Sequence, residues 1–302
     1  MQLQDEKQAL RKRAGAGADV TLKTRLITAA LMIAIMFVLL MCRGVVLFAA
    51  SLLLTLAAQY ELINAFSEKG IVPYRIPSYL SAVLCCCTVF FIGMNAGAAA
   101  ILVSIFIMVF TGLFSKEHGM DKTIYSTFIA IYPTLCTMCM LELERLSFEL
   151  LLCGICAAIG SDTFGYFIGH AFGRRKLCPR ISPKKTVEGA IGSVFGGVFI
   201  LVVARWLFGM INFDVTFNIF GGSYNWVMKD IQITWGQVMI GGALGATISI
   251  IGDLFASSIK RYCKIKDFST FLPGHGGILD RLDGVFFSCA AMYLFYFVMS
   301  IV

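Results

Sequence analysis

Nine long apolar stretches separate the charged residues of this chain and constrain its fold more than any other feature. They lie at residues 26–42, 44–66, 77–93, 97–114, 122–141, 148–171, 189–209, 235–257 and 282–302. The hydrocarbon core of a bilayer is about 30 Å thick, and about 20 apolar residues cross it as a helix. Since backbone polar groups find no water there, each stretch is expected to be helical. The sequence predicts an all-α, polytopic membrane protein with about nine transmembrane helices.

The composition excludes two other classes of protein. Only 14% of the 302 residues are charged and 58% are hydrophobic, whereas an ordinary soluble domain has about 25% charged residues. A disordered chain is far less apolar than this one. Nearly all of the 11 cysteines lie within the apolar stretches, so we expect small side chains in the membrane core rather than disulfides or zinc ligands.

The basic residues predict how the chain is oriented. If the nine stretches alternate across the membrane, nearly all of the 25 Lys and Arg residues fall on the face that holds the N-terminus. Loops rich in Lys and Arg lie on the cytoplasmic side. We therefore predict a multi-pass protein of the cell membrane with a cytoplasmic basic tail at 1–25. A single membrane domain at 26–302 follows, with its catalytic motifs in 155–285.

Most of the polar residues that are costly in a membrane lie after Gly160. They form four elements, which are Ser161 to Tyr166, Ser182 to Gly189, Gly252-Asp253, and Ser257 to Asp283. The predicted topology places all four at the cytoplasmic face. Asp162 and Asp253 interrupt apolar helices, where each carboxylate costs about 2.5–3.5 kcal/mol, so both need a compensating interaction. For Glu61 and Arg205 we expect no more than a helix-packing partner.

Asp280 and Asp283 indicate a metal site. They are three residues apart at the start of the last stretch, so on a helix they project from one face and repel each other unless a cation lies between them. Mg²⁺ prefers one or two carboxylates, with water and phosphates completing its shell. The alternative is helix capping by the two acids, with Arg281 as an ion-pair partner.

The segment before this acidic pair is rich in glycine. Gly276 and Gly277 follow Pro273-Gly274-His275, and glycines let backbone N–H groups approach a phosphate closely. His275 is a phosphate ligand, a proton carrier or simply a turn residue. We expect His118 and His170 to have no role in the site.

Two groups of basic residues suggest bound phosphate. Ser182-Pro183 resembles a helix N-cap followed by proline at the first helical position. Lys184 and Lys185 would then oppose the helix dipole unless an anion is bound there. The alternative is attraction of these lysines to anionic lipid headgroups. We favour that alternative for Arg174, Arg175 and Lys176. Further along, Lys260, Arg261 and Lys266 are expected to complete a polyphosphate site beside the carboxylates, with Asp267 supporting one lysine.

The fourth polar element, Ser257 to Asp283, resembles the signature of the phosphatidate cytidylyltransferases (CDP-diacylglycerol synthases). The matching run is Ser257-x-Ile259-Lys260-Arg261-x4-Lys266-Asp267-x-Ser269-x2-Leu272-Pro273-x-His275-Gly276-Gly277-Ile278-x-Asp280-Arg281-Leu282-Asp283. Asp162-Thr163 and the segment from Ser182 to Gly189 also look like this family. Small departures are Val187, where tryptophan is common, and Gly165, where alanine is common.

The resemblance implies an enzyme that condenses CTP with phosphatidic acid to give CDP-diacylglycerol and pyrophosphate. It implies a homodimer in membrane lipid, with no nucleic-acid partner. It also implies a requirement for Mg²⁺ held at Asp253, Asp280 and Asp283, and it leaves open a second, monovalent cation. Lys260 and Arg261 join these three acids as the predicted catalytic residues. The predicted substrate-binding residues are Asp162, Ser182, Lys184, Lys185, Thr186, Lys266, Asp267, His275, Gly276, Gly277 and Arg281.

Two other functions remain as alternatives. A CTP-dependent polyprenol or phytol kinase would share a membrane fold and a nucleotide site, but it would transfer the γ-phosphoryl group. A membrane transporter would also use intramembrane carboxylates and glycine-broken helices, and its ionisable groups would surround the bilayer midplane rather than cluster at one face.

Overall fold

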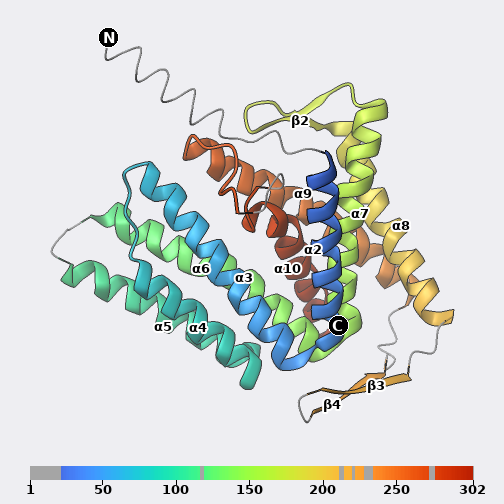
Figure 1. The fold of residues 1–302 in the computed structure, drawn as a ribbon, viewed down its shortest axis with the longest axis horizontal. Coiled ribbons are helices and arrows are strands. Elements are labelled where there is room, and N and C mark those ends of the chain that lie inside the picture. Colours follow the sequence, from blue (N-terminus) through green and yellow to red (C-terminus); the bar gives the residue numbers. More distant parts are fainter. Residues whose placement is uncertain are drawn as a thin grey trace.

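The structure is a computed structural model that describes residues 22–115, 119–210, 214–219, 222–227, 234–271 and 276–301. These residues form nine helices, each overlapping one of the predicted apolar stretches (Figure 1). The helices are α2 (Leu22–Cys42), α3 (Gly44–Glu68), α4 (Arg75–Phe91), α5 (Met94–Phe114), α6 (Met120–Leu146), α7 (Phe148–Phe172), α8 (Val187–Met210), α9 (Trp235–Tyr262) and α10 (Leu279–Ile301). The predicted all-α class is confirmed, and of the predicted tail, residues 1–21 lie outside the described ranges.

Seven of these helices, α3 and α5 to α10, are long and apolar enough to cross a membrane. The helix α4 has 17 residues, which span about 25 Å at a rise of 1.5 Å per residue. In α2 the apolar part is the shorter segment Ala30–Leu40. A multi-pass membrane protein is therefore confirmed, whereas the number of nine membrane spans stays a prediction.

The helices pack in two groups that share a core. Helices α3 to α6 contact one another, and α7 to α10 contact one another (Figure 1). One core cluster crosses between the groups and joins Leu62 of α3 and Ile129 of α6 to Ile259 of α9 and Phe286 of α10. The end of α9 and the start of α10 are thereby held against the first half of the chain.

Glycines let α7, α8 and α9 approach very closely. A Cβ atom added to Gly196 of α8 would lie 2.5 Å from the carbonyl oxygen of Gly160 in α7. A Cβ on Gly197 would lie 3.0 Å from the carbonyl oxygen of Gly242 in α9. Small residues are the usual means by which membrane helices pack. This crossing places the polar end of α7 directly beside α8 and α9.

The interpretation of Ser182-Pro183 as a helix start is wrong. Ser182–Thr186 forms strand β2, which pairs antiparallel with β1 (Lys176–Cys178). The cap is Thr186, whose Oγ1 accepts a hydrogen bond from the Gly189 N–H at 3.1 Å, and α8 begins after it. The fixed φ of proline suits an extended strand as well as a helix start, so the pattern was ambiguous. Lys184 and Lys185 therefore lie on a hairpin rather than in a helical turn.

A second hairpin lies in the segment 212–230, between two of the predicted apolar stretches. Strands β3 (Asp214–Ile219) and β4 (Gly222–Val227) pair antiparallel. In Figure 1 they lie at the opposite end of the bundle from β2. The two hairpins therefore mark the two ends of the helical bundle.

The glycine crossing gives a test of the packing. Gly196→Ala must push α7 and α8 apart, because the new methyl group meets backbone, and overpacking of this kind costs about 1–3 kcal/mol. Gly236→Ala is the matched control, since its Cβ would have no neighbour nearer than 4.0 Å. We expect only Gly196→Ala to lower the midpoint of thermal unfolding in detergent, followed by far-ultraviolet circular dichroism. Equal midpoints in the two variants would contradict the close crossing.

Candidate active site

A cavity of about 610 Å³ lies between α7, α8, α9, α10 and the β1–β2 hairpin. It gathers eight of the residues that the sequence predicts for the site, from segments more than 100 residues apart. They are Asp162, Lys184, Lys185, Thr186, Asp253, Asp280, Arg281 and Asp283. Ligand pockets usually have volumes of about 300–1,000 Å³, so this cavity can hold a small molecule.

Three carboxylates from three helices meet in this cavity. Asp162 comes from α7, Asp253 from α9 and the buried Asp283 from α10. Glycines beside two of them bring the helices together. A Cβ on Gly252 would lie 2.8 Å from the Asp283 carbonyl oxygen, and one on Gly284 would lie 4.0 Å from Asp162 Oδ2. The three carboxylates are close enough to repel one another.

Two lysines offset part of this negative charge. Lys185 Nζ lies 2.6 Å from Asp253 Oδ2, and Lys260 Nζ lies 2.6 Å from Asp280 Oδ1. Asp162 and Asp283 form no ion pair with any of the residues that the structure describes. Within the described residues, the Asp283 Oδ1 atom accepts a hydrogen bond only from the neighbouring Gly284 N–H, at 2.7 Å. Asp162 and Asp283 are therefore the carboxylates of the cavity for which a bound cation is the natural partner.

The donors around the cavity fit a hard cation such as Mg²⁺, which binds oxygen ligands. Within the described ranges, no three Asp, Glu, His or Cys side chains are arranged to hold an ion by themselves. Mg²⁺ typically binds one or two protein carboxylates and takes its other ligands from water and substrate phosphates. The fit therefore depends on a phosphate-bearing substrate being present.

Asp280 is largely engaged by protein donors. Its Oδ2 atom accepts hydrogen bonds from the backbone N–H groups of Phe268, at 2.9 Å, and Gly277, at 3.0 Å. Its Oδ1 atom accepts from Lys260. Only a second lone pair of Oδ1 remains for a metal, so Asp280 both anchors the adjoining loop and lines the cavity.

Several predicted residues do not line the cavity. They are Ser182, Lys260, Arg261, Lys266, Asp267, Gly276 and Gly277, and His275 lies outside the described residues. The exposed Arg261 donates from Nε to the carbonyl oxygen of Ile181, at 3.2 Å, and so holds the hairpin. Asp267 forms no ion pair in the part of the chain that the structure describes. Gly276 has φ +81°, a conformation that favours glycine.

Sequence reasoning missed other residues of the cavity wall, including His170 and Lys176. Tyr166 lines the cavity too, and its ring lies parallel to that of His170, with the ring centroids 6.1 Å apart. The signal was present in the sequence, because Asp162, Tyr166 and His170 are spaced by four residues and so share one face of a helix. Lys176, which we assigned to lipid headgroups, faces the cavity from β1.

Glu188 fixes the hairpin that carries the basic residues. Its carboxylate accepts hydrogen bonds from the backbone N–H groups of Arg174, at 3.0 Å, and Arg175, at 3.2 Å. These two residues lead into β1, and Glu188 lies in the first turn of α8. The hairpin is therefore tied to the helix that follows it, and this holds Lys184 and Lys185 at the cavity.

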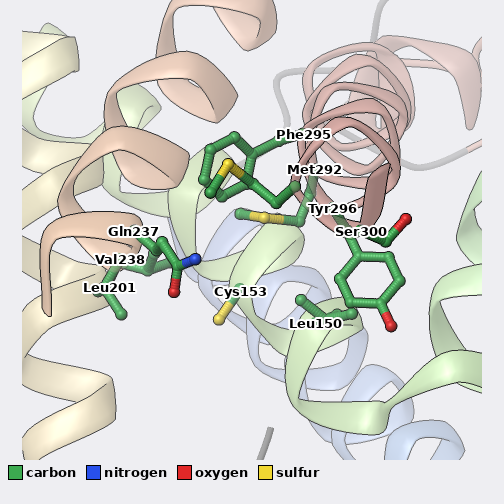
Figure 2. A pocket seen from close by; sticks show the side chains of 10 residues that line it. Leu150, Cys153, Leu201, Gln237, Val238, Met292, Phe295, Tyr296 and Ser300 are labelled. Carbon is green, nitrogen blue, oxygen red and sulfur yellow. The ribbon is translucent and has the colours of Figure 1, made fainter. Parts of the chain in front are cut away.

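A second cavity lies toward the other end of the same four helices (Figure 2). Its volume is about 180 Å³, and its wall is mainly apolar, with Leu150, Leu201 and Met292. Gln237 and Cys153 are among its few polar groups, and it holds no charged side chain. It is too small and too apolar to bind a nucleotide, so the charged cavity is the candidate active site.

The fold and this cavity define a class: a polytopic membrane protein whose acidic and basic side chains meet at one end of the bundle. A model of the cytidylyltransferase family matches residues 23–299. The chain therefore belongs to the cytidylyltransferase family, as the signature indicated.

Several curated relatives of this chain are named phosphatidate cytidylyltransferase. The protein from Aquifex aeolicus is 36% identical over 180 residues, which are 59% of this chain and 59% of the relative. The protein from Bacillus subtilis is 29% identical over 204 residues, 67% of this chain and 68% of the relative. The protein from Haemophilus influenzae is 39% identical over 137 residues, 45% and 42% of the two chains. The chain thus spans about three fifths of the Aquifex relative.

Proposed function

We propose that this protein is a phosphatidate cytidylyltransferase, which condenses CTP with phosphatidic acid to form CDP-diacylglycerol and pyrophosphate. The observation that carries the proposal is the convergence of Asp162, Asp253 and Asp283 with Lys184 and Lys185 in one cavity of a membrane bundle. The names of the similar bacterial proteins support the same reaction.

In this reaction an oxygen of the lipid phosphate attacks the α-phosphorus of CTP. The bond from the α-phosphorus to the bridging oxygen breaks, and pyrophosphate leaves with that electron pair. Because the nucleophile is already an anion, the protein needs no strong base. The difficulty is the repulsion between two anions, which Lys184, Lys185 and Arg281 reduce by placing positive charge at the phosphates.

We propose Mg²⁺ as the cofactor, with Asp253 and Asp283 as its protein ligands and with water and substrate phosphates as the others. Asp280, which the sequence also predicts as a ligand, is engaged by Lys260 and by two backbone N–H groups. When bound, Mg²⁺ neutralises the triphosphate and the charge that develops on the leaving pyrophosphate. The hydrogen bond from Gly284 and the ion pair with Lys185 hold the Asp283 and Asp253 carboxylates in place. Asp162 lies beside them without an ion pair among the described residues, and we assign it to substrate binding.

The proposed location suits both substrates. CTP arrives from water, whereas phosphatidic acid presents its headgroup at the membrane surface. The cavity lies at one end of α7 to α10 beside the β1–β2 hairpin, so it can reach both phases. We propose that this end faces the cytoplasm, since the basic loops gather on that side, and that the enzyme works as a homodimer, as the family resemblance implies.

The reaction is tested with CTP that carries label on the α- or the γ-phosphate. Purified protein in detergent is given phosphatidic acid and Mg²⁺, and the lipid product is identified. We expect the α-label in the lipid and the γ-label in pyrophosphate. Label from the γ-phosphate in a lipid product would show a kinase instead, and the absence of any labelled lipid would refute the proposed reaction.

Loss of a cavity carboxylate should stop the reaction without unfolding the protein. Asp283→Asn is expected to lower kcat by about a hundredfold or more, the scale on which a single electrostatic contact to a reacting group acts. The matched control is Asp121→Asn, at the exposed start of α6. Initial rates and size-exclusion profiles of both variants are compared, and turnover of Asp283→Asn at the wild-type rate would refute the assignment.

The hairpin lysines should matter for nucleotide binding. Replacing Lys184 and Lys185 together with glutamine is expected to raise the KM for CTP by about a hundredfold or more, because hydrogen bonds to charged groups contribute about 1.5–3 kcal/mol each. Arg75→Gln, at the exposed start of α4, serves as the control for lost positive charge. An unchanged KM for CTP in the double variant would contradict a phosphate site on the hairpin.

A further inference from the structure

Glu61 is a buried carboxylate that the proposed chemistry does not use. It lies in α3, far along the chain from the signature, and only 3% of the residue is exposed. The sequence suggested at most a helix-packing partner for it. None of the ion pairs in the described part of the chain involves this residue, so its charge must be balanced in another way.

The partners of Glu61 are the loop before α10 and the start of that helix. Its Oε1 atom accepts hydrogen bonds from Ser269 Oγ, at 2.6 Å, and from the Ile278 N–H, at 2.8 Å. Its Oε2 atom accepts from the Leu279 N–H, at 2.8 Å. The first N–H groups of a helix have no partner within it, and its positive dipole end favours an anion. Glu61 therefore caps α10 from a helix more than 200 residues away.

Gly277 shows how tightly this contact is built. A Cβ atom on Gly277 would lie 2.6 Å from Glu61 Oε2, so the carboxylate packs against the glycine backbone. The N–H of Gly277 donates to Asp280 Oδ2. The turn from Gly276 to Leu279 is therefore held between two carboxylates, Glu61 of α3 and Asp280 of α10.

The support behind Glu61 is rigid. Leu62, Ile63 and Phe66, which follow it in α3, are fully or almost fully buried. They belong to the core cluster that includes Leu279 and Phe286 of α10. Because this packing fixes α3 at Glu61, the start of α10 has little freedom while its hydrogen bonds to Glu61 persist.

We propose that Glu61 is a positioning residue: its carboxylate fixes the turn before α10 and thereby sets the place of Asp280, Arg281 and Asp283 in the cavity. The proposal rests on the proposed function, and it gives the first half of the chain a part in the active site. The groups that donate hydrogen bonds to Glu61 belong to Ser269, Ile278 and Leu279, which do not line the cavity, so its effect passes through the geometry of α10.

The test compares Glu61→Gln with Glu68→Gln, an exposed glutamate at the end of the same helix. Glutamine keeps the size of Glu61 but turns one acceptor into an N–H₂ group that faces N–H or O–H donors. Hydrogen exchange followed by mass spectrometry measures whether Glu61 holds this turn, without any activity measurement. We expect exchange in the peptide that covers 276–283 to be about tenfold faster in Glu61→Gln, the loss that removal of one such hydrogen bond brings.

A second measurement separates positioning from simple stabilisation. If the turn sets Asp283, the Mg²⁺ concentration for half-maximal CDP-diacylglycerol formation should rise by about tenfold in Glu61→Gln. A purely structural loss would lower the maximal rate and leave that concentration unchanged. Faster exchange with a raised Mg²⁺ requirement supports the proposal, whereas an unchanged value for either quantity overturns it. If the wild-type protein forms no CDP-diacylglycerol, the proposed function fails. The exchange result alone then decides whether Glu61 holds the turn before α10.

Gly277→Ala provides a route that does not depend on the folding of Glu61→Gln. The added methyl group would collide with the Glu61 carboxylate, so we expect faster exchange at 276–283 and slower turnover. Combining it with Glu61→Asp, which draws the carboxylate back by one methylene group, should restore part of both. If Gly277→Ala behaves as wild type, or if the second change gives no recovery, Glu61 does not hold the turn.

Discussion

Mutual repulsion of three carboxylates inside an apolar bundle is the constraint on which the rest of this structure depends. Ionised carboxylates are costly among membrane helices, yet Asp162, Asp253 and Asp283 converge from three of them. Lys185 offsets one of these charges. The glycine contacts of α7, α8 and α9 and the capped start of α10 hold the remaining charges together. We propose that a cation and substrate phosphates share the cavity and reduce this repulsion, which connects the architecture to the proposed reaction.

The two groups of helices contribute differently to this site. Helices α7 to α10 supply every side chain that lines the cavity apart from those on the β1–β2 hairpin. Helices α3 and α6 supply the packed surface against which the ends of α9 and α10 lie. A buried carboxylate of α3 binds the loop between them. The first half of the chain is therefore part of the framework that fixes the geometry of the second.

Much of this could be predicted from the sequence, and the exceptions have physical reasons. The helices follow from the length of the apolar stretches, because lipid leaves the backbone no other choice. Asp162 and Asp253 stood out because charge is costly there, and Asp283 stood out because it lies three residues after Asp280. The Ser182-Pro183 pattern misled because a proline suits both a strand and a helix start. The partner of Glu61 was hidden because the contact joins distant segments through backbone N–H groups, which no side-chain pattern reveals.

The most direct test of the central claim is the position of a divalent cation in the cavity. A crystal structure of the protein with Mn²⁺ and CTP, with anomalous scattering recorded for manganese, locates the ion without reference to turnover. The account predicts a manganese peak bonded to carboxylate oxygens of Asp253 and Asp283 and to the triphosphate. A peak bonded elsewhere, with these two carboxylates free of metal, would contradict it.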